Sequence, residues 1–159
     1  MSAEDDALAR IFSGARYRVR VPGRGSVPLR VQARLPQSLA AWLGAAAQPW
    51  SLVTAWNPGA ARRPAADNRA AMRALRAALA QEGIALRLLP AQSGDGSGGW
   101  REAHLFVAGI ARSRAVGLAR RFGQRAVLYG IGGGRVRLAV LPVGRMDSMA
   151  AAPAQSPPR

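Results

Sequence analysis

The run Leu52-Val53-Thr54-Ala55-Trp56-Asn57-Pro58 constrains the fold of this chain more than any other segment. Five residues suited to a buried strand are followed by an amide and then by a proline, which cannot donate a hydrogen bond to a sheet. A short apolar run that ends at turn residues is typical of a strand covered on both faces. We therefore expect a central strand over 51–57 with Asn57 at its carboxyl edge. In open α/β sheets, ligands bind at that edge.

The composition narrows the class of protein. A chain of 159 residues with 49% hydrophobic residues can form one domain with a buried core. It has no cysteine, which excludes disulfides, cysteine metal ligands and a cysteine nucleophile. No apolar run approaches the roughly 20 residues that span a bilayer, and the acidic start Glu4-Asp5-Asp6 differs from a secretory signal. We expect a cytoplasmic protein without a membrane partner.

The formal net charge is +15, and all 23 basic residues are arginine. Arginine makes bidentate contacts with phosphate and carboxylate and stacks on flat rings. The charge therefore favours nucleic acid or nucleotide partners. A genome rich in G and C would also encode arginine in place of lysine, which explains the choice of base but not the shortage of acidic residues.

The first third of the chain predicts an arm and a hairpin. Residues 1–14 form the expected N-terminal helical arm, and a hairpin of strands over 17–21 and 29–34 follows around a glycine-rich turn. Apolar and arginine residues alternate along both predicted strands. The candidate nucleic-acid contacts are the arginines of its outer face: Arg16, Arg18, Arg20, Arg30 and Arg34.

The remaining patterns predict three further helices and four further strands. A helix is expected over 37–47, and another from Pro64 to Gly83 that places Asn68 on the same inward face as Met72. A helix beginning near Ser113 and ending at Gly123 is expected as well. The predicted strands after 51–57 are 84–89, which ends at Pro90 before a loop over 91–99, then 102–109, 126–131 and 136–141.

This order of elements predicts an α/β or α+β fold. We expect a single domain over 15–145, with one mixed sheet flanked by about three helices and a disordered tail over 146–159. The relative direction of the strands over 51–57 and 102–109 stays open. If they are antiparallel, Glu102 lies beside Asn57; if they are parallel, it lies at the opposite edge.

Three short islands together resemble a known family. They are Thr54-Ala55-Trp56-Asn57-Pro58 with Asn68 downstream, Trp100-Arg101-Glu102, and Arg121-Phe122-Gly123-Gln124. In combination they resemble the bacterial domain-of-unknown-function family 3293, over residues 48–141 approximately. The resemblance implies a shared fold and a shared site, and it implies no reaction.

The candidate ligand-binding residues come from strand ends and from one inward helix position. They are Trp56, Asn57, Asn68, Trp100, Glu102 and Gln124. We expect them to form a cleft near the Trp56–Pro58 turn in which amides and a carboxylate orient a ligand and a tryptophan provides a flat wall. The alternative is that the amides close turns and Glu102 pairs with an arginine.

Three functions are compatible with these residues. The leading one is binding of a small polar or anionic ligand, nucleotides included. The second is association with RNA or DNA through the arginine faces. The third is an enzyme that uses Glu102, with or without His104, in proton transfer. A solitary histidine on a strand is also typical of a packed, hydrogen-bonded residue. The pattern predicts no metal site and no cofactor, and it leaves the oligomeric state open.

Overall fold

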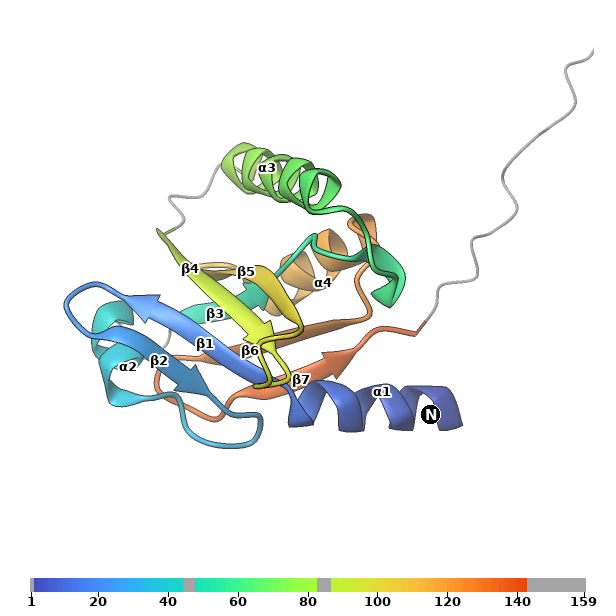
Figure 1. The fold of residues 1–159 in the computed structure, drawn as a ribbon. Helices are drawn as coiled ribbons and strands as arrows, with labels where there is room; N and C mark the ends of the chain where they lie inside the picture. Colours follow the sequence, from blue (N-terminus) through green and yellow to red (C-terminus); the bar gives the residue numbers. More distant parts are fainter. Residues whose placement is uncertain (1, 45–47, 83–86, 143–159) are drawn as a thin grey trace, which may run out of the picture.

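A computed structural model describes residues 2–44, 48–82 and 87–142 of the chain (Figure 1). Its helices are α1 (Ala3–Gly14), α2 (Gln37–Leu43), η1 (Pro58–Ala60, a 3-10 helix), α3 (Ala65–Gln81) and α4 (Arg112–Arg121). Its strands are β1 (Arg16–Val21), β2 (Gly25–Leu29), β3 (Pro49–Val53), β4 (Arg87–Gly94), β5 (Arg101–Ala108), β6 (Ala126–Ile131) and β7 (Arg137–Val140). The tail predicted over 146–159 lies outside the described residues, as do positions 45–47 and 84–86 of two predicted elements.

The strands form one curled sheet in the order β2-β1-β4-β5-β3-β6-β7 (Figure 1). Every neighbouring pair is antiparallel. The prediction of a mixed sheet is therefore wrong, and the fold is α+β with four α-helices in the described part of the chain: the N-terminal α1 and three others. β3 and β4 are joined through α3 and run in the same direction. Because β5 lies between them in the sheet, they are not neighbours and form no parallel pair.

The sheet separates two hydrophobic cores. Phe106 of β5 faces the concave side, where it stacks on Trp50 at 5.0 Å between ring centroids and packs with residues of α2. Leu105 and Val107 face the other side, which α3 and α4 cover. The alternation predicted along this strand is thus confirmed, and it places Glu102 and His104 on the concave side with Phe106.

β3 is buried on both faces, as its apolar sequence predicts, but it ends at Val53 and not at Asn57. The next residue explains the early end. The hydroxyl of Thr54 donates to the carbonyl of Ala103 at 2.6 Å and accepts from the N–H of Trp56 at 3.0 Å. These side-chain bonds replace the strand ladder and begin the turn.

The second strand of the N-terminal hairpin begins four residues earlier than expected. β1 alternates between exposed arginines and buried apolar residues as predicted, but β2 ends at Leu29. Arg24 closes the turn on Val21, so pairing already starts at Gly25. Gln32 then has a positive φ of 72°, which a continuing strand does not allow. Arg30 and Arg34 therefore lie outside the hairpin. The backbone of Arg34 instead forms an isolated antiparallel β-bridge with that of Arg135.

β4 continues through Pro90 to Gly94, so the predicted strand end at Pro90 is wrong, and the loop predicted over 91–99 begins only at Asp95. β1 pairs only with the part of β4 from Ala91 onward. The segment of β4 that contains Pro90 therefore pairs with β5 alone and is an edge of the sheet at this point. A sheet tolerates proline at such an edge. The hairpin between β4 and β5 is longer as a result, and Gln92 and Ser93 belong to the sheet.

α3 and α4 form where their periodic patterns predict them. Asn68 is 2% exposed and lies with Met72 on the buried face of α3, as its helical phase requires. α4 begins at Arg112 with Ala111 as its N-cap, two residues before the predicted Ser113 cap. Gly123, with φ 69°, ends it in a Schellman arrangement in which Gln124 N–H donates to Ala119 O at 2.8 Å. None of the helices in the described part of the chain is long and apolar enough to cross a membrane.

Candidate functional site

Two asparagine side chains hold the turn that follows β3. The backbone of Asn57 is left-handed, with φ 46° and ψ 62°, a conformation that asparagine adopts more readily than most residues. Its N–H donates to Asn68 Oδ1 at 2.8 Å, and Asn68 Nδ2 donates to Asn57 Oδ1 at 2.8 Å. The N–H of Arg63 donates to the same Asn57 oxygen at 3.0 Å. The turn and the first turn of α3 are therefore joined as one unit.

Glu102 lies beside this unit, at the start of β5. Because β3 and β5 are antiparallel, the start of β5 meets the end of β3, and Asn57 Nδ2 donates to Glu102 Oε1 at 3.0 Å. Burial raises the pKa of Glu102, and hydrogen bonds from Asn57 and Trp100 partly offset that increase. The carboxyl group thus keeps its proton to a higher pH than a solvated glutamate.

Gln124 completes the set from the end of α4. Its Nε2 donates to the carbonyl of Trp56 at 3.1 Å and to that of Phe122 at 3.4 Å. The N–H of Gly59 donates to the carbonyl of Gly123 at 2.7 Å. These bonds attach the turn after β3 to the end of α4. Each amide nitrogen of this set thus donates to a group within the protein, so the amides hold the shape of the site.

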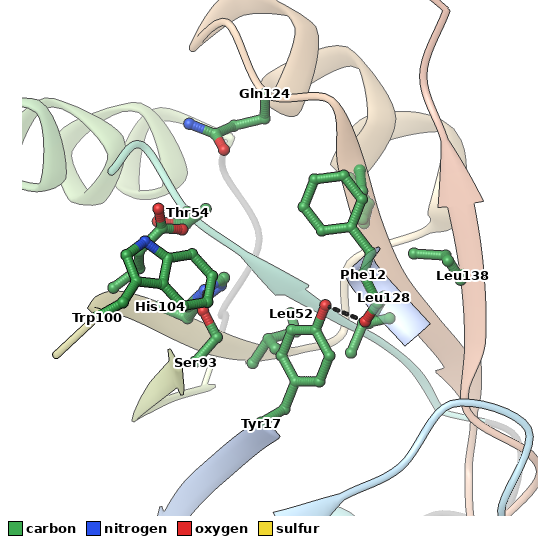
Figure 2. A pocket seen from close by; sticks show the side chains of 13 residues that line it. Phe12, Tyr17, Leu52, Thr54, Ser93, Trp100, His104, Gln124, Leu128 and Leu138 are labelled. Atoms are coloured by element: carbon green, nitrogen blue, oxygen red, sulfur yellow. Dashed lines mark hydrogen bonds between the residues drawn. The ribbon is translucent and has the colours of Figure 1, made fainter. Parts of the chain in front are cut away.

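An interior cavity of about 30 Å³ lies on the concave side of the sheet (Figure 2). Trp100, His104 and Ser93 form one wall, and Phe12 and residues of β6 and β7 form the opposite one. A single water needs roughly 10–15 Å³ by this measure, so the cavity accommodates two or three waters and no metabolite. The full lining is Phe12, Tyr17, Leu52, Thr54, Ser93, Trp100, Glu102, His104, Gln124, Ala126, Val127, Leu128 and Leu138.

His104 is a packed residue of this cavity. Its Nε2 is 2.8 Å from Ser93 Oγ, its ring contacts Tyr17 edge-on at 6.1 Å, and its Nδ1 has no partner among the described residues. Burial lowers the pKa of His104 to about 3, so the imidazole is neutral at physiological pH. Burial and then the Glu102 charge raise the pKa of Tyr17, whose hydroxyl donates to Phe12 O at 2.7 Å. Glu102 itself is only half-buried and lines the same cavity as His104.

A second hollow, which we call the recess, lies on the outer side of the same turn. It has a volume of about 150 Å³. Trp100 lines both this recess and the interior cavity and thus separates them. No carboxylate lines the recess, and Asp67 in the first turn of α3 stays outside it. Its lining residues are Trp56, Asn57, Arg62, Arg63, Ala65, Asn68, Gly99, Trp100 and Arg101.

The structure therefore divides the predicted ligand-binding residues between two hollows. Trp56, Asn57 and Asn68 line the recess, Glu102 and Gln124 line the interior cavity, and Trp100 lines both. The predicted proximity of Asn57 and Glu102 is confirmed by their hydrogen bond.

The five arginines predicted for nucleic acid do not line a single hollow, although Arg16, Arg18 and Arg20 share the exposed face of β1. Arg16, Arg18 and Arg30 line a hollow of about 510 Å³ next to the end of α1. Arg20 lies farther along β1 in a smaller hollow that also includes Arg18. Arg34 is apart from both, beside Arg135.

Sequence reasoning missed the three arginines of the recess. Arg62 and Arg63 directly precede α3, and Arg101 directly precedes Glu102. The only signal in the sequence for these arginines was that they lie close to predicted site residues. That signal is weak in a chain with 23 arginines. Ser93 was missed because Pro90 was expected to end its strand. Among the residues that the structure describes, no three histidine or acidic side chains come together to hold a metal ion.

Comparison with known proteins gives one match. The model of a family described as "Protein of unknown function (DUF3293)" matches residues 53–127, which confirms the resemblance found in the sequence. The matched segment begins at the last residue of β3 and ends within β6, so it contains the turn, Glu102 and Gln124. No curated protein and no solved structure matches the chain.

Proposed function

We propose, starting from a DUF3293-like domain over residues 53–127, that this protein binds the anionic group of a small polar ligand in the recess. One observation carries the proposal: three arginines, Arg62, Arg63 and Arg101, line one hollow that no carboxylate lines. Arginine presents a planar fork that matches phosphate and carboxylate. We propose in addition that the protein is bacterial and that it is located in the cytoplasm.

The size of the recess limits what it can hold. Ligand pockets usually have volumes of about 300–1,000 Å³. The recess, at about 150 Å³, suits a phosphate or carboxylate group and not a whole nucleotide. The rest of a larger ligand would extend over the indole of Trp56 or Trp100, which supplies the flat wall that the sequence predicts.

The recess has a wall that is held in place before a ligand arrives. The hydrogen bonds between Asn57 and Asn68 fix the turn, and Arg62 Nη2 donates to Gly99 O at 3.2 Å. A preformed wall reduces the entropy that a ligand must overcome on binding. Asn57 and Asn68 thus contribute to binding indirectly, because they fix the shape of the recess.

A thermal-shift screen of phosphate, nucleotides and small carboxylates tests this proposal, followed by calorimetry on any ligand that raises the Tm. A ligand at 100 times its Kd stabilises the folded state by about 2.7 kcal/mol, which is readily measured. Arg101→Glu should abolish the shift, whereas the matched control Arg73→Glu, on an exposed part of α3, should retain it. A screen without any stabilising anion, or equal loss in both variants, would contradict the proposal.

A second candidate function is binding of nucleic acid, and the hollow lined by Arg16, Arg18 and Arg30 favours it. Binding of a single strand should weaken with salt at a log–log slope of about −0.7 per phosphate neutralised. Arg18→Glu and Arg30→Glu should each reduce that slope by about the contribution of one phosphate. If binding is absent at physiological salt, this candidate fails and the recess is unaffected.

A further inference from the structure

The outer face of the sheet carries a further hollow, which shares no residue with the recess or the interior cavity. α4 contacts β3 and β6 but begins only at Arg112, so the end of β6 and the start of β7 extend beyond it. The hollow there has a volume of about 460 Å³, within the usual range of small-molecule sites. We call it the tyrosine groove, and its lining is Pro49, Trp50, Ala111, Arg112, Tyr129, Gly130, Ile131, Gly134, Arg135 and Arg137.

The tyrosine groove combines an aromatic ring with an exposed aliphatic side chain. Tyr129 is half-buried, and Ile131, two residues along the same strand, is 62% exposed. Within the described residues, only Ile11 is a similarly exposed large hydrophobic side chain. Two apolar groups on one face of a strand, left partly in water inside a concave hollow, favour a ligand with a flat apolar surface.

Arginines flank the tyrosine on two sides. The guanidinium of Arg112 lies 4.8 Å from the centroid of the Tyr129 ring, and Arg137 is the cross-strand partner of Tyr129 in the β6–β7 ladder. Arg135 is anchored by a hydrogen bond of 2.8 Å from its Nη1 to Gln32 O, so part of its fork stays available. Arg112, Arg135 and Arg137 form no ion pair with the described residues, and no carboxylate lines the groove.

We infer that the tyrosine groove binds a nucleotide, with the base stacked against Tyr129 and Ile131 and the phosphate held by Arg112, Arg135 and Arg137. Stacking on an aromatic side chain is available to every base, and arginine forks match phosphate oxygens. A flat ring joined to a multiply charged group complements both the apolar part of the groove and its arginines. An acyl chain complements only the apolar part, and an acidic peptide complements only the arginines. This inference is independent of the recess, with which the groove shares no residue.

The nucleotide can come from two sources, a free nucleoside phosphate or one unit of a single strand. Isothermal titration of the full chain with AMP, ATP, inorganic phosphate and a ten-nucleotide oligouridylate distinguishes them. AMP or ATP binding more tightly than phosphate, with no gain for the oligomer, indicates a free nucleotide. Tighter binding of the oligomer at equal salt indicates a strand.

Variants connect the binding to the groove. Tyr129→Ala should weaken nucleotide binding by about tenfold or more, whereas Tyr129→Phe should retain it because the ring is kept. Arg137→Glu should weaken binding strongly, and the matched charge change Arg76→Glu on exposed α3 should leave it within about twofold. Arg101→Glu should remove only the part of the binding that belongs to the recess and should leave the part that depends on Tyr129, which separates this inference from the proposed function. Thermal unfolding of each variant checks that it is folded.

Two results would overturn the inference. The first is that neither the nucleotides nor the oligomer binds at physiological salt. The second is binding that Tyr129→Ala leaves unchanged or that Arg76→Glu weakens as much as Arg137→Glu does, since either pattern means attraction to the overall charge of the protein.

Discussion

At the scale of single residues, the Asn57–Asn68 pair determines the geometry of the candidate site. Asn57 has a left-handed backbone, and both its backbone N–H and its side-chain oxygen are bonded to a residue eleven positions away. Asn68 is almost completely buried, so the loss of its amide would leave polar groups of the turn without partners. The stability of the turn thus depends on a side chain of α3.

The first prediction is that Asn68→Ala lowers the free energy of unfolding by about 1–3 kcal/mol, because a buried donor and acceptor lose their partners. Urea denaturation measures the change. Arg69→Ala, at the neighbouring exposed position, is the control and should stay within about 0.5 kcal/mol of the native protein. An Asn68→Ala protein as stable as this control would show that the pair does not hold the turn.

The second prediction concerns the sole histidine. The unfolded chain protonates His104 near pH 6.5, whereas burial lowers the pKa in the folded state to about 3. The unfolded state therefore binds more protons between these values, and the contribution of His104 to stability is lost as the pH falls below 6.5. In the tag-free protein, the imidazole NMR signals should show the neutral form from pH 8 to pH 5. A titration midpoint near 6.5 would mean that the ring is solvated.

The helical phase of Asn68 could be predicted from the sequence, because it follows from spacing within one helix. The recess arginines could not. Arg62, Arg63 and Arg101 are three of 23 arginines, and only the folded turn brings them together. The interior position of Ser93 depended on whether Pro90 ends a strand. Whether the strand continues past Pro90 depends on where β1 pairs with β4. That pairing joins residues far apart in the sequence, so the local sequence does not reveal it.

At the scale of elements, α1 differs from the rest of the molecule. It has no buried residue, and Ile11 on it is 62% exposed. It is attached through contacts with β7, through Phe12 at the interior cavity, and through ion pairs from Arg125 to Glu4 and Asp5. β5, in contrast, is paired on both sides at the centre of the sheet. Elements with few buried apolar contacts open at low free energy.

The third prediction is that amides of α1 exchange with deuterium at least about tenfold faster than those of β5, because α1 can detach without unfolding the sheet. Mass spectrometry of peptides that cover the two elements measures this. Arg125→Gln should speed exchange in α1 further, and Arg120→Gln, exposed at the end of α4, should not. Equal protection of α1 and β5 would mean that the helix is an integral part of the core.

At the scale of the whole molecule, positive charge exceeds negative charge, with 23 arginines against 8 acidic residues. Among the described residues, only Arg114 and Arg125 form ion pairs. The sequence predicted the strands well because alternation is local, but it did not predict their order. The β3–α3–β4 segment reads as a parallel unit, and only the insertion of β5 between the two strands makes every neighbouring pair antiparallel.

The fourth prediction follows from this excess of charge. Raising the ionic strength from about 0.01 M to about 0.15 M shortens the screening length from about 30 Å to about 8 Å. Repulsion among arginines should then weaken, so the Tm in sodium chloride should rise. Differential scanning calorimetry measures it. A Tm that falls with salt would indicate that attractive ion pairs outweigh the repulsion.

The recess is the central claim, and titration of the ¹⁵N-labelled protein with inorganic phosphate tests it most directly. Shifts in the spectrum should saturate and should be concentrated at Arg62, Arg63, Ala65, Arg101 and the indole of Trp100. Arg101→Glu should remove the saturable shifts and Arg73→Glu should retain them. Shifts that do not saturate, or that spread evenly over exposed arginines such as Arg18 and Arg30, would contradict the account.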